Sequence, residues 1–559
     1  EIRLSLVGSE MCIRDRTHCC GNIISKQTFA EYLKMQSDFI IAGAGHNSLI
    51  TACYLSKAGY SCEILDARSI AGGGCATEEI LGAGYKIDTC STGHTLILQN
   101  PLIKMDELGI VEKYGLSYLH PDPVAHVALP DGEQITMFLD VEKTIKEIER
   151  FSGADALSYR RLIQEFDELR PLLGKARSGP IGFAPSLQDL LKDHPRGGVW
   201  LRRMAMSAKD IILREFKNPH IRAFMGWMTF QTAVPIDQAG TGLLPYQITG
   251  PRQSNSWSIP KGGSGELTDS LVKFLEDHGA IFTYDTVVDS LILNNGRCIG
   301  VKAVDNREFH AKLGVISTIH IKHLVNMAPK ELWGEDFLFG ADTYNVGVPF
   351  FSTYLATKEP PIFKTPRGPR SAVSAGYAGW FEDLVQSGRD IYDGKLSEKI
   401  SWLLVATPTL VDPSRAPLGH HTVKFLTHTI YDLPKVGPKG WEKMKIEFTE
   451  KLIEKIQEFC PSFTNDVILD RIIKSPVDIE SWNMHMINGA PHGGDRSVTF
   501  SGAQRPAPGW AQHKMPIKGL WQTGGTTHPG GSITGYPGRN AAMVVLKDLG
   551  LDPCNTMLI

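Results

Sequence analysis

Near its amino-terminal end the chain carries one stretch, FIIAGAGHNSLITACYLSKAGYSCEILD, whose order of elements leaves little freedom of fold. A short apolar run enters a Gly43-x-Gly45 turn, a segment with helical spacing of apolar residues follows, and a second apolar run ends at Asp66. This order predicts strand, turn, helix and strand, with Gly59 ending the helix. Glycines in such a turn let the backbone approach a pyrophosphate at the helix N-terminus. The stretch therefore predicts a Rossmann-like dinucleotide-binding unit.

The residues that follow this unit distinguish between two dinucleotides. ARSIAGGGCATEE adds Arg68, Gly72 and Gly73 directly after the second strand. An arginine and a second strip of bare backbone suit an extended ligand with a diphosphate and a ribityl chain, which favours FAD over NAD. Asp66 is expected to bind the adenosine ribose. Ser48 stands where the fingerprint usually has a third glycine, and because serine is small we expect a slight shift of the helix, not its loss.

A second glycine-rich motif lies near the other end of the chain. GLWQTGGTTHPGGSITGYPGRNAAMVVLKDL combines a short apolar run, a glycine loop and a helical segment. The loop amides and the helix N-terminus are expected to face the pyrimidine edge of a flavin, where the helix dipole stabilises the reduced anion. His528, in this loop, and His492, in GAPHGGD, are the candidate catalytic residues; the alternative for each is a histidine bonded to backbone in a turn. The loop holds no cysteine, so non-covalent FAD is expected.

These motifs resemble the phytoene desaturase-like branch of the FAD-dependent amine-oxidase superfamily. The resemblance rests on GAGHNSL, LDARSIAGGGCATEE, IPKGGSGELTDSL and GGTTHPGGSITGYPGRNAA, and it covers roughly residues 36–549. HGGD with QRPAPGWAQHKMPIKGLWQTGG looks most similar to the pyridine nucleotide-disulfide oxidoreductase domain-containing protein 2-like group. By position the resemblance implies cofactor contacts at Gly43, Gly45, Asn47, Asp66, Arg68, Gly72, Gly73, Val288, Gly524, Gly525, Gly531 and Ser532, with Val288 at the adenine and the last four at the flavin.

Helical and strand-like runs in the middle of the chain, with Pro- and Gly-rich joints at PRQSNSWSIPKGGSG and SGAQRPAPGW, predict the domain organisation. The fold class is α/β, a Rossmann-like FAD-binding domain of the two-dinucleotide-binding-domain type interwoven with an α+β substrate domain. Residues 35–120, 256–330 and 481–559 are assigned to the FAD-binding domain, and residues 121–255 and 331–480 to the substrate domain with its helical cover. In that cover, VWLRRMAMSAKDIILREFKN is predicted to form an amphipathic helix that is basic as well as apolar. Peripheral membrane contact is one interpretation of this helix, and inward packing is the other.

The first residues differ from the rest of the chain. LVGSEMCIRDR resembles the translation of a sequencing adapter, and Met35 stands where an initiator would. Residues 1–34 are therefore interpreted as an artefact or leader and kept out of the fold argument. If Met35 is the start, no targeting peptide remains, and a cytoplasmic protein is expected.

Composition argues against several classes of function. The net charge of −3 argues against a nucleic-acid partner, which would normally require a basic face. Ten cysteines without a CxxC pair indicate free thiols in a reducing compartment. The histidines near the C-terminal end have spacings that fit no compact ligand set, so no metal site is expected. No G-x-S-x-G elbow supports a hydrolase.

The resemblance and the flavin motifs together imply an FAD-dependent oxidoreductase of the desaturase or dehydrogenase kind. We expect it to take a hydride from a largely apolar small molecule onto flavin N5, with oxygen, a quinone or another acceptor reoxidising the flavin. Two alternatives stay open. One keeps the fold and oxidises an amine or amino acid; the other is a non-catalytic binding protein similar to the Rab GDP-dissociation inhibitors.

Overall fold

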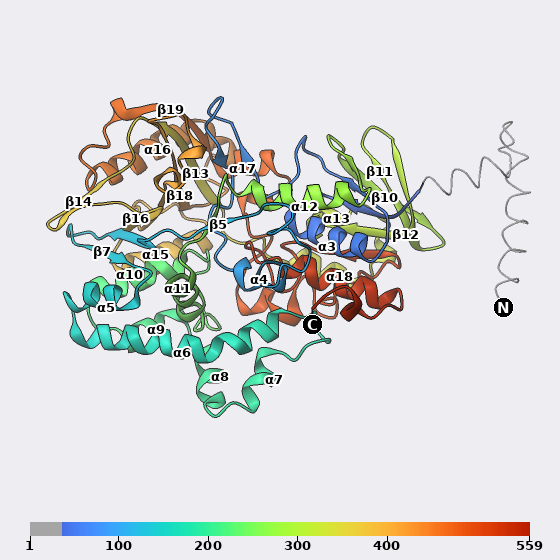
Figure 1. Cartoon of the computed structure of the whole chain (residues 1–559), viewed down its shortest axis with the longest axis horizontal. Helices are drawn as coiled ribbons and strands as arrows, with labels where there is room; N and C mark the ends of the chain where they lie inside the picture. The colour runs from blue at the N-terminus through green and yellow to red at the C-terminus, as the bar shows by residue number, and fades with distance from the viewer. Residues whose placement is uncertain (1–35, 559) are drawn as a thin grey trace, which may run out of the picture.

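The computed structural model describes residues 36–558, and the segment interpreted as an artefact or leader lies outside them. Within the described residues the chain forms two lobes, each built on a seven-stranded sheet (Figure 1). Strands and helices alternate in the first lobe. In the second lobe helices pack on both faces of the sheet, α10 (Pro219–Phe230) against Gly376 on one face and α16 (Trp441–Gln457) against Thr353 on the other. The α/β fold class predicted from the sequence, with a Rossmann-like unit, is confirmed.

The first sheet has the strand order β10–β11–β12–β1–β2–β9, and β20 pairs with β12. β1 lies parallel to both β2 and β12, and the side chains from Phe39 to Ala42 are all buried. Parallel strands with both faces covered are expected to be apolar throughout, which is why this stretch does not alternate. The strands are β1 (Ser37–Ala42), β2 (Cys62–Leu65), β9 (Ile281–Thr283), β10 (Val288–Asn294), β11 (Arg297–Ala303), β12 (Glu308–Ser317) and β20 (Leu520–Gln522).

Two helices from opposite ends of the chain pack together on this sheet. α3 (His46–Lys57) follows the glycine turn, and α18 (Tyr536–Asp548) follows the C-terminal glycine loop. α12 (Gly265–Asp277) also packs against α3. The two glycine motifs are therefore neighbours in space, although nearly the whole chain separates them (Figure 1).

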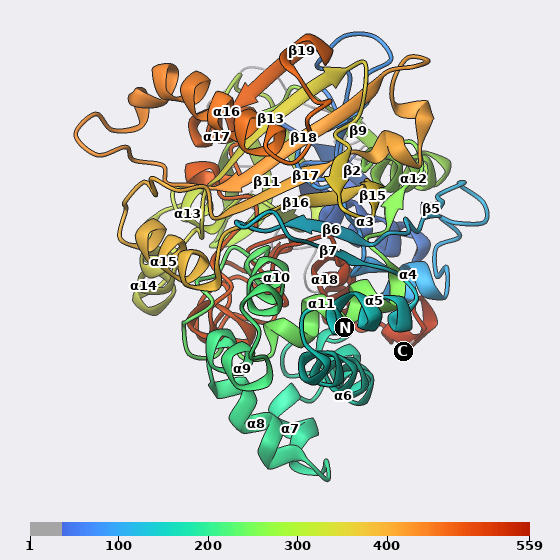
Figure 2. The same cartoon turned by 90° about the vertical axis from the view of Figure 1, so that its left-hand side faces the viewer.

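The second sheet has the order β19–β13–β18–β17–β16–β6–β7 and is antiparallel except where β6 meets β16. In Figure 2 its strands run across the upper half of the view, with α10 and α11 (Leu244–Asn255) below them and α16 at the upper left. Its strands are β6 (Ala125–Ala128), β7 (Gln134–Met137), β13 (Phe350–Thr357), β16 (Ser374–Ala378), β17 (Trp402–Ala406), β18 (His421–His428) and β19 (Ile468–Lys474). The strands of the two sheets come from separate parts of the sequence, and the domain boundaries between them remain a prediction.

The helical cover differs from the prediction in one respect. The basic segment predicted as a single helix is two helices, α8 (Gly197–Ala205) and α9 (Ala208–Glu215). Ser207 begins α9 through a capping box, in which its hydroxyl accepts the Asp210 N–H at 3.0 Å. Trp200 on α8 is fully buried. No helix within residues 36–558 is long and apolar enough to span a membrane.

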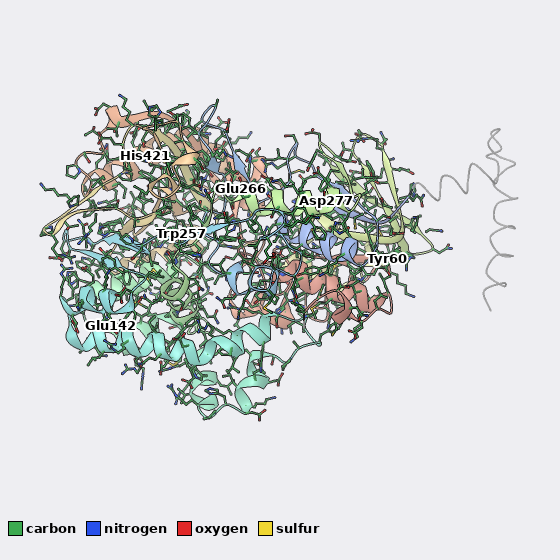
Figure 3. The ribbon with its side chains drawn as sticks, viewed as in Figure 1. Tyr60, Glu142, Trp257, Glu266, Asp277 and His421 are labelled. Carbon is green, nitrogen blue, oxygen red and sulfur yellow. The ribbon has the colours of Figure 1, made fainter. Side chains whose placement is uncertain are left out.

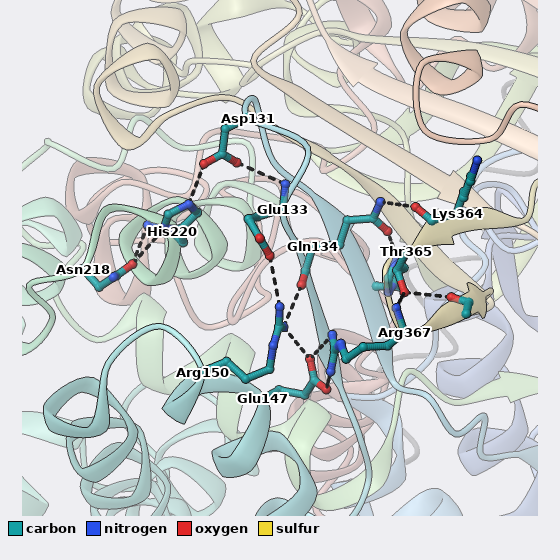
Figure 4. A network of polar contacts seen from close by, with 12 residues as sticks. Asp131, Glu133, Gln134, Glu147, Arg150, Asn218, His220, Lys364, Thr365 and Arg367 are labelled. Carbon is teal, nitrogen blue, oxygen red and sulfur yellow. Dashed lines mark hydrogen bonds and ion pairs between the residues drawn. The ribbon is translucent and has the colours of Figure 1, made fainter.

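An ion-pair network fastens the cover to one edge of the second sheet. Glu147, on α5 (Val141–Glu149), accepts from Arg367 in the turn between β14 (Phe363–Thr365) and β15 (Gly368–Arg370) (Figure 4). Arg150 also contacts Glu147, at 3.3 Å, and reaches Glu133 beside β7. The network lies at the periphery and leaves the inner face of the sheet free for the site.

Candidate functional site

One cavity of about 870 Å³ lies where the two lobes meet. Its wall is built from the β1–α3 turn, the end of β2, residues 479–492, the C-terminal glycine loop and one face of the second sheet. Trp257, which lines it, is labelled near the middle of the molecule in Figure 3. Of the residues predicted for cofactor and catalysis, the cavity is lined by Gly43, Gly45, Asn47, Asp66, Arg68, Gly73, Val288, His492, Gly524, Gly525, Gly531 and Ser532. Gly72 and His528 do not line it.

The turn after β1 needs its glycines for two separate reasons. Gly43 has a φ of +104°, and a Cβ there would lie 2.2 Å from Thr318 Oγ1. Gly45 has no atom near its missing Cβ, so its open side belongs to the cavity. α3 begins at His46 without a side-chain cap and without an acid in its first turn. Its first N–H groups are therefore available to an anion such as a diphosphate.

Ser48 replaces the third glycine of the fingerprint and supports the turn from behind. It is fully buried, and its hydroxyl contacts the carbonyl oxygens of Gly43 and Gly45, the latter at 2.8 Å. Ser48 thus gives the turn hydrogen bonds that a glycine could not make. Asn47 joins the turn to α18, because its side-chain oxygen accepts the Gly538 N–H at 3.2 Å.

Gly72 supports the same turn without lining the cavity. Its N–H donates to the Ala44 carbonyl at 2.8 Å, and a Cβ at Gly72 would lie 2.5 Å from the Cys75 carbonyl oxygen. Asp66 lies beside this contact and accepts the N–H groups of Ala44 at 2.6 Å and Arg68 at 2.8 Å. Burial raises the pKa of Asp66, and the two N–H donors oppose that rise.

Arg68 is held between an acid and an indole ring. It donates to Glu78 at 2.6 Å, and its guanidinium lies 4.2 Å from the centroid of Trp482. Lys474 Nζ lies at the same distance from that centroid, and burial lowers the pKa of Lys474 to about 8. Nη1 of Arg68 is buried and has no partner among the described residues. A phosphate or ribityl oxygen would satisfy it. Trp482 and Lys474 gave no recognisable sequence signal.

The C-terminal loop approaches the cavity as bare backbone. A Cβ on Gly531 would lie 2.1 Å from the His492 carbonyl oxygen, so only glycine fits there. Ser532 has a φ of +87°, which is unusual for a residue with a side chain and costs about 1–3 kcal/mol. Such strain persists where the surrounding structure holds the backbone for a ligand.

Arg505, which the sequence analysis missed, holds this loop in place. Its side chain is 1% exposed and donates to the carbonyl oxygens of Gly525 at 2.9 Å, Asp495 at 2.7 Å and Phe500 at 3.0 Å, with His492 at 3.3 Å. One guanidinium thus joins the HGGD segment to the terminal glycine loop.

The two candidate catalytic histidines have different surroundings. His492 lines the cavity, its Nε2 has no partner among the described residues, and its ring meets Phe350 edge-on at 5.7 Å. Burial lowers the pKa of His492 to about 3. His528 is buried outside the lining, and burial lowers its pKa to about 4. Both imidazoles are therefore neutral at pH 7. Within residues 36–558, no group of His, Cys, Asp and Glu side chains is arranged to hold a metal ion.

The second sheet contributes a largely apolar wall. Phe350, Leu404, Ala406 and Leu426 line the cavity from β13, β17 and β18. Val288 lines the opposite end, where Val304 is 64% exposed, so that end opens to solvent. The cavity therefore runs from a dinucleotide turn to an apolar sheet face. The bare glycine turns, the uncapped helix and the unpartnered Arg68 nitrogen fit FAD.

Comparison with known proteins agrees with this geometry. Residues 41–105 match the family model of the NAD(P)-binding Rossmann-like domain. The chain is 28% identical to the mouse pyridine nucleotide-disulfide oxidoreductase domain-containing protein 2, covering 92% of this chain and 94% of the relative. It is 26% identical to a limonene dehydrogenase polypeptide of Castellaniella defragrans, covering 92% of this chain and 96% of the relative.

The chain is also similar to a phytoene desaturase in sequence and to an amine oxidase in fold. The chain is 24% identical to a phytoene desaturase (neurosporene-forming) of Cereibacter sphaeroides, covering 91% of this chain and 94% of the relative. A solved structure of putrescine oxidase bound to putrescine superposes with a TM-score of 0.59 over 92% of this chain and 99% of that one, at 13% identity, and so shows the shared fold. These findings confirm the resemblance predicted from the sequence.

Proposed function

We propose that this chain, an FAD-dependent oxidoreductase related to the phytoene desaturases and the amine oxidases, withdraws a hydride from a largely apolar small molecule. FAD, when bound, supplies N5 as the hydride acceptor. The observation that carries the proposal is the continuous cavity that joins the dinucleotide turn to the apolar face of the second sheet.

In this proposal, different residues of the chain bind different parts of the FAD. The first turn of α3 and Arg68 hold the diphosphate, Asp66 holds the ribose, and the backbone beside Val288 holds the adenine. Gly524, Gly525, Gly531 and Ser532 face the flavin. The FAD is proposed to be held without a covalent bond.

The apolar wall orients the substrate and keeps water away from the reacting C–H bond. Phe350, Leu404 and Leu426 make that wall. His492 lines the cavity beside Phe350, and because its imidazole is neutral it can accept or donate a hydrogen bond without adding charge. His528 lies behind the glycine loop and is proposed to act through that loop. No dedicated acid or base is required for hydride withdrawal.

The test is the visible spectrum of the purified full chain, before and after acid denaturation. We expect a flavin spectrum, with FAD released into the supernatant. Anaerobic addition of limonene, chosen because a relative is named for it, should bleach the flavin more than addition of putrescine does. Bleaching by putrescine alone would favour an amine oxidase. A folded, colourless protein that remains so with added FAD would contradict the proposal and favour a binding protein.

We propose two further properties of the chain. One is a cytoplasmic location, and the other is peripheral contact with a membrane through the α8–α9 segment. The burial of Trp200 supports inward packing of α8 instead. Flotation of the purified chain with anionic vesicles would distinguish the two interpretations.

A further inference from the structure

A row of four residues crosses the inner face of the second sheet. Ser374 pairs with Ala406, Ala406 with Lys424, and Lys424 with Tyr354, each directly opposite the next on antiparallel strands. Directly opposed residues point to the same side of a sheet. Ala406 and Lys424 line the cavity, so the whole row belongs to the face that the cavity exposes.

Lys424 is a buried cation without a carboxylate partner among residues 36–558. Its Nζ donates to the backbone carbonyls of Cys90 and Asp88, the latter at 3.3 Å, and the residue is 7% exposed. An ammonium has three N–H donors, so these two carbonyls leave one. The neighbouring Asp88 carboxylate is already engaged by Arg415 at 2.7 Å. Burial lowers the pKa of Lys424, as expected for an ammonium whose charge is not balanced.

Arg252 is a second such cation on the other side of Ala406. Its guanidinium donates to Ser374 Oγ at 3.4 Å and to Gln231 Oε1, and it lies 5.4 Å from the centroid of Trp257. It is 5% exposed and makes no ion pair within residues 36–558. Burial lowers the pKa of Arg252 to about 9.

Gln231 presents a donor beside this second cation. Because its Oε1 accepts from Arg252, the orientation of the amide is set, and Nε2 is left without a partner in the described part of the chain. Gln231 and Trp257 both line the cavity. The same wall thus carries two separate N–H sources, the free N–H of Lys424 and the amide of Gln231.

The charges on this wall do not balance. Lys424 lies two strands away from Ser374, the residue to which Arg252 donates, and the small Ala406 lies between them. Two strand spacings correspond to about 10 Å. An unpaired buried charge is strongly destabilising, whereas a charge-assisted hydrogen bond to an anion offsets much of that effect. Leu404 and Leu426 form the next row on the same face of the sheet, and Phe350 lies one row further along. The anion is therefore expected to belong to an otherwise apolar molecule.

We infer that the substrate of the proposed oxidoreductase is an apolar molecule that carries one carboxylate, and that Lys424 binds this carboxylate with Gln231 and Arg252 beside it. This inference rests on the proposed function. It differs from a hydrocarbon substrate in requiring an oxygen anion at the sheet end of the cavity. A carboxylate suits the wall better than a phosphate, because the wall offers few donors and no glycine turn.

The test compares a carboxylate with a neutral molecule of equal chain length. The flavin-loaded full chain is titrated with decanoate and with decan-1-ol, and the visible flavin spectrum reports binding. We expect decanoate to bind at least about tenfold more tightly. Lys424→Met should raise the Kd of decanoate about tenfold and that of decanol less than about twofold, while Lys424→Arg should keep the preference. Lys364→Met, at an exposed lysine of β14, is the matched control and should change neither.

A second variant tests the charge balance without removing a buried group. Gln231→Glu places a carboxylate beside Arg252, so it should raise Tm and abolish the preference for decanoate. Equal binding of decanoate and decanol by the unaltered protein would overturn the inference. The inference would also be overturned if Lys424→Met weakened the binding of decanoate and of decanol equally. A failure of decanoate and of its longer and shorter homologues to bind would overturn it as well.

Failure of the proposed function gives a different result. The flavin spectrum is recorded before any titration, and a colourless protein contradicts the oxidoreductase itself. In that case the shift of Tm on adding decanoate or decanol still tests the carboxylate site. Lys424→Met that retains flavin but loses decanoate binding also shows that Lys424 does not serve the cofactor.

Discussion

At the scale of single residues, the buried guanidinium of Arg505 does the most to join separate segments. Its carbonyl partners belong to residues 492–500 and to Gly525, two stretches that both border the cavity. The planar guanidinium of an arginine can donate to several acceptors at once, whereas the ammonium of a lysine is a point charge on a flexible side chain. Arg505 therefore positions the C-terminal glycine loop, which is proposed to face the flavin.

We expect Arg505→Lys to lower the free energy of unfolding by about 3 kcal/mol or more, because several buried carbonyls lose their donors. The same variant should release FAD more readily, since the terminal loop is no longer joined to the HGGD segment. Thermal unfolding and the flavin content after gel filtration measure the two effects. Arg307→Lys, in an exposed pair with Asp305, is the control and should stay within about 0.5 kcal/mol of the parent.

Asp66 supports the turn and is proposed to bind the ribose, so its removal should have two effects. Asp66→Ala should weaken FAD binding about tenfold or more, because a charge-assisted hydrogen bond to the ribose is lost. It should also lower the free energy of unfolding by about 1–3 kcal/mol, since the Ala44 and Arg68 N–H groups lose their acceptor. Asp66→Asn keeps an acceptor and should retain more of that stability. Unchanged FAD retention in Asp66→Ala would contradict the ribose contact.

At the scale of elements, the crossing of α3 and α18 places both glycine motifs at one site. A Cβ on Gly538 would lie 2.3 Å from the Asn47 carbonyl oxygen, so the helices approach as closely as glycine allows. Thr51 donates to the Gly538 carbonyl at 2.9 Å across the same contact. Any increase in this spacing moves the N-terminus of α3, where the diphosphate is proposed to bind.

Gly538→Ala should therefore lower the free energy of unfolding by about 1–3 kcal/mol and weaken FAD binding together. Gly174→Ala in α6 (Gly153–Arg177) is the matched control, because no atom lies within 4 Å of the position its Cβ would take. That change should stabilise the chain by about 0.5–1 kcal/mol, since alanine favours the helix. Denaturant unfolding and FAD titration measure both variants. Equal behaviour of the two would show that the crossing is not tightly packed.

At the scale of the whole molecule, the folded chain keeps many histidines neutral. Burial is the largest cause in each case, and it lowers the pKa to about 3 or 4. These residues are His46, His94, His126, His428, His485, His492, His513 and His528. They titrate near pH 6.5 once unfolded, so the unfolded chain binds more protons than the folded chain between about pH 6.5 and 4.

The stability that these neutral histidines contribute is present above about pH 6.5 and is lost as the pH falls toward 4. Each contributes about 1.4 kcal/mol per pH unit in that window, so we expect Tm to fall steeply between about pH 6.5 and 5. His428→Phe should reduce the number of protons taken up on unfolding by about one, so the free energy of unfolding should depend less steeply on pH. The phenyl ring should still fit, because the His428 ring already stacks on Trp402 at 4.3 Å. Thermal unfolding from about pH 7.5 to 4.5 measures both. A flat Tm across that window would contradict the expectation.

Much of the first lobe could be predicted because its signals are local. The Gly43-x-Gly45 turn, α3 and the second strand are contiguous, and each follows from spacing and glycine geometry alone. The prediction of a single helix over the basic segment was wrong, because the structure has two helices there. The apolar pattern continues through both helices and is a stronger signal than the single capping serine, Ser207, that separates them. Gly72 and His528 lie in correctly recognised motifs, but which of their residues line the cavity depends on contacts outside the motif.

What the sequence by itself determined is the class of fold and the stretches that form glycine turns, because both depend on neighbours along the chain. The tertiary structure alone decided which buried groups meet at the cavity. Lys424, Arg252 and Gln231 come from three separate elements, and Trp482 carries no motif. Arg505 lies in the QRPAPGW stretch, but nothing in that stretch indicates which carbonyl oxygens it contacts. Their roles arise from burial and from missing partners, which are properties of the folded arrangement and not of any local pattern.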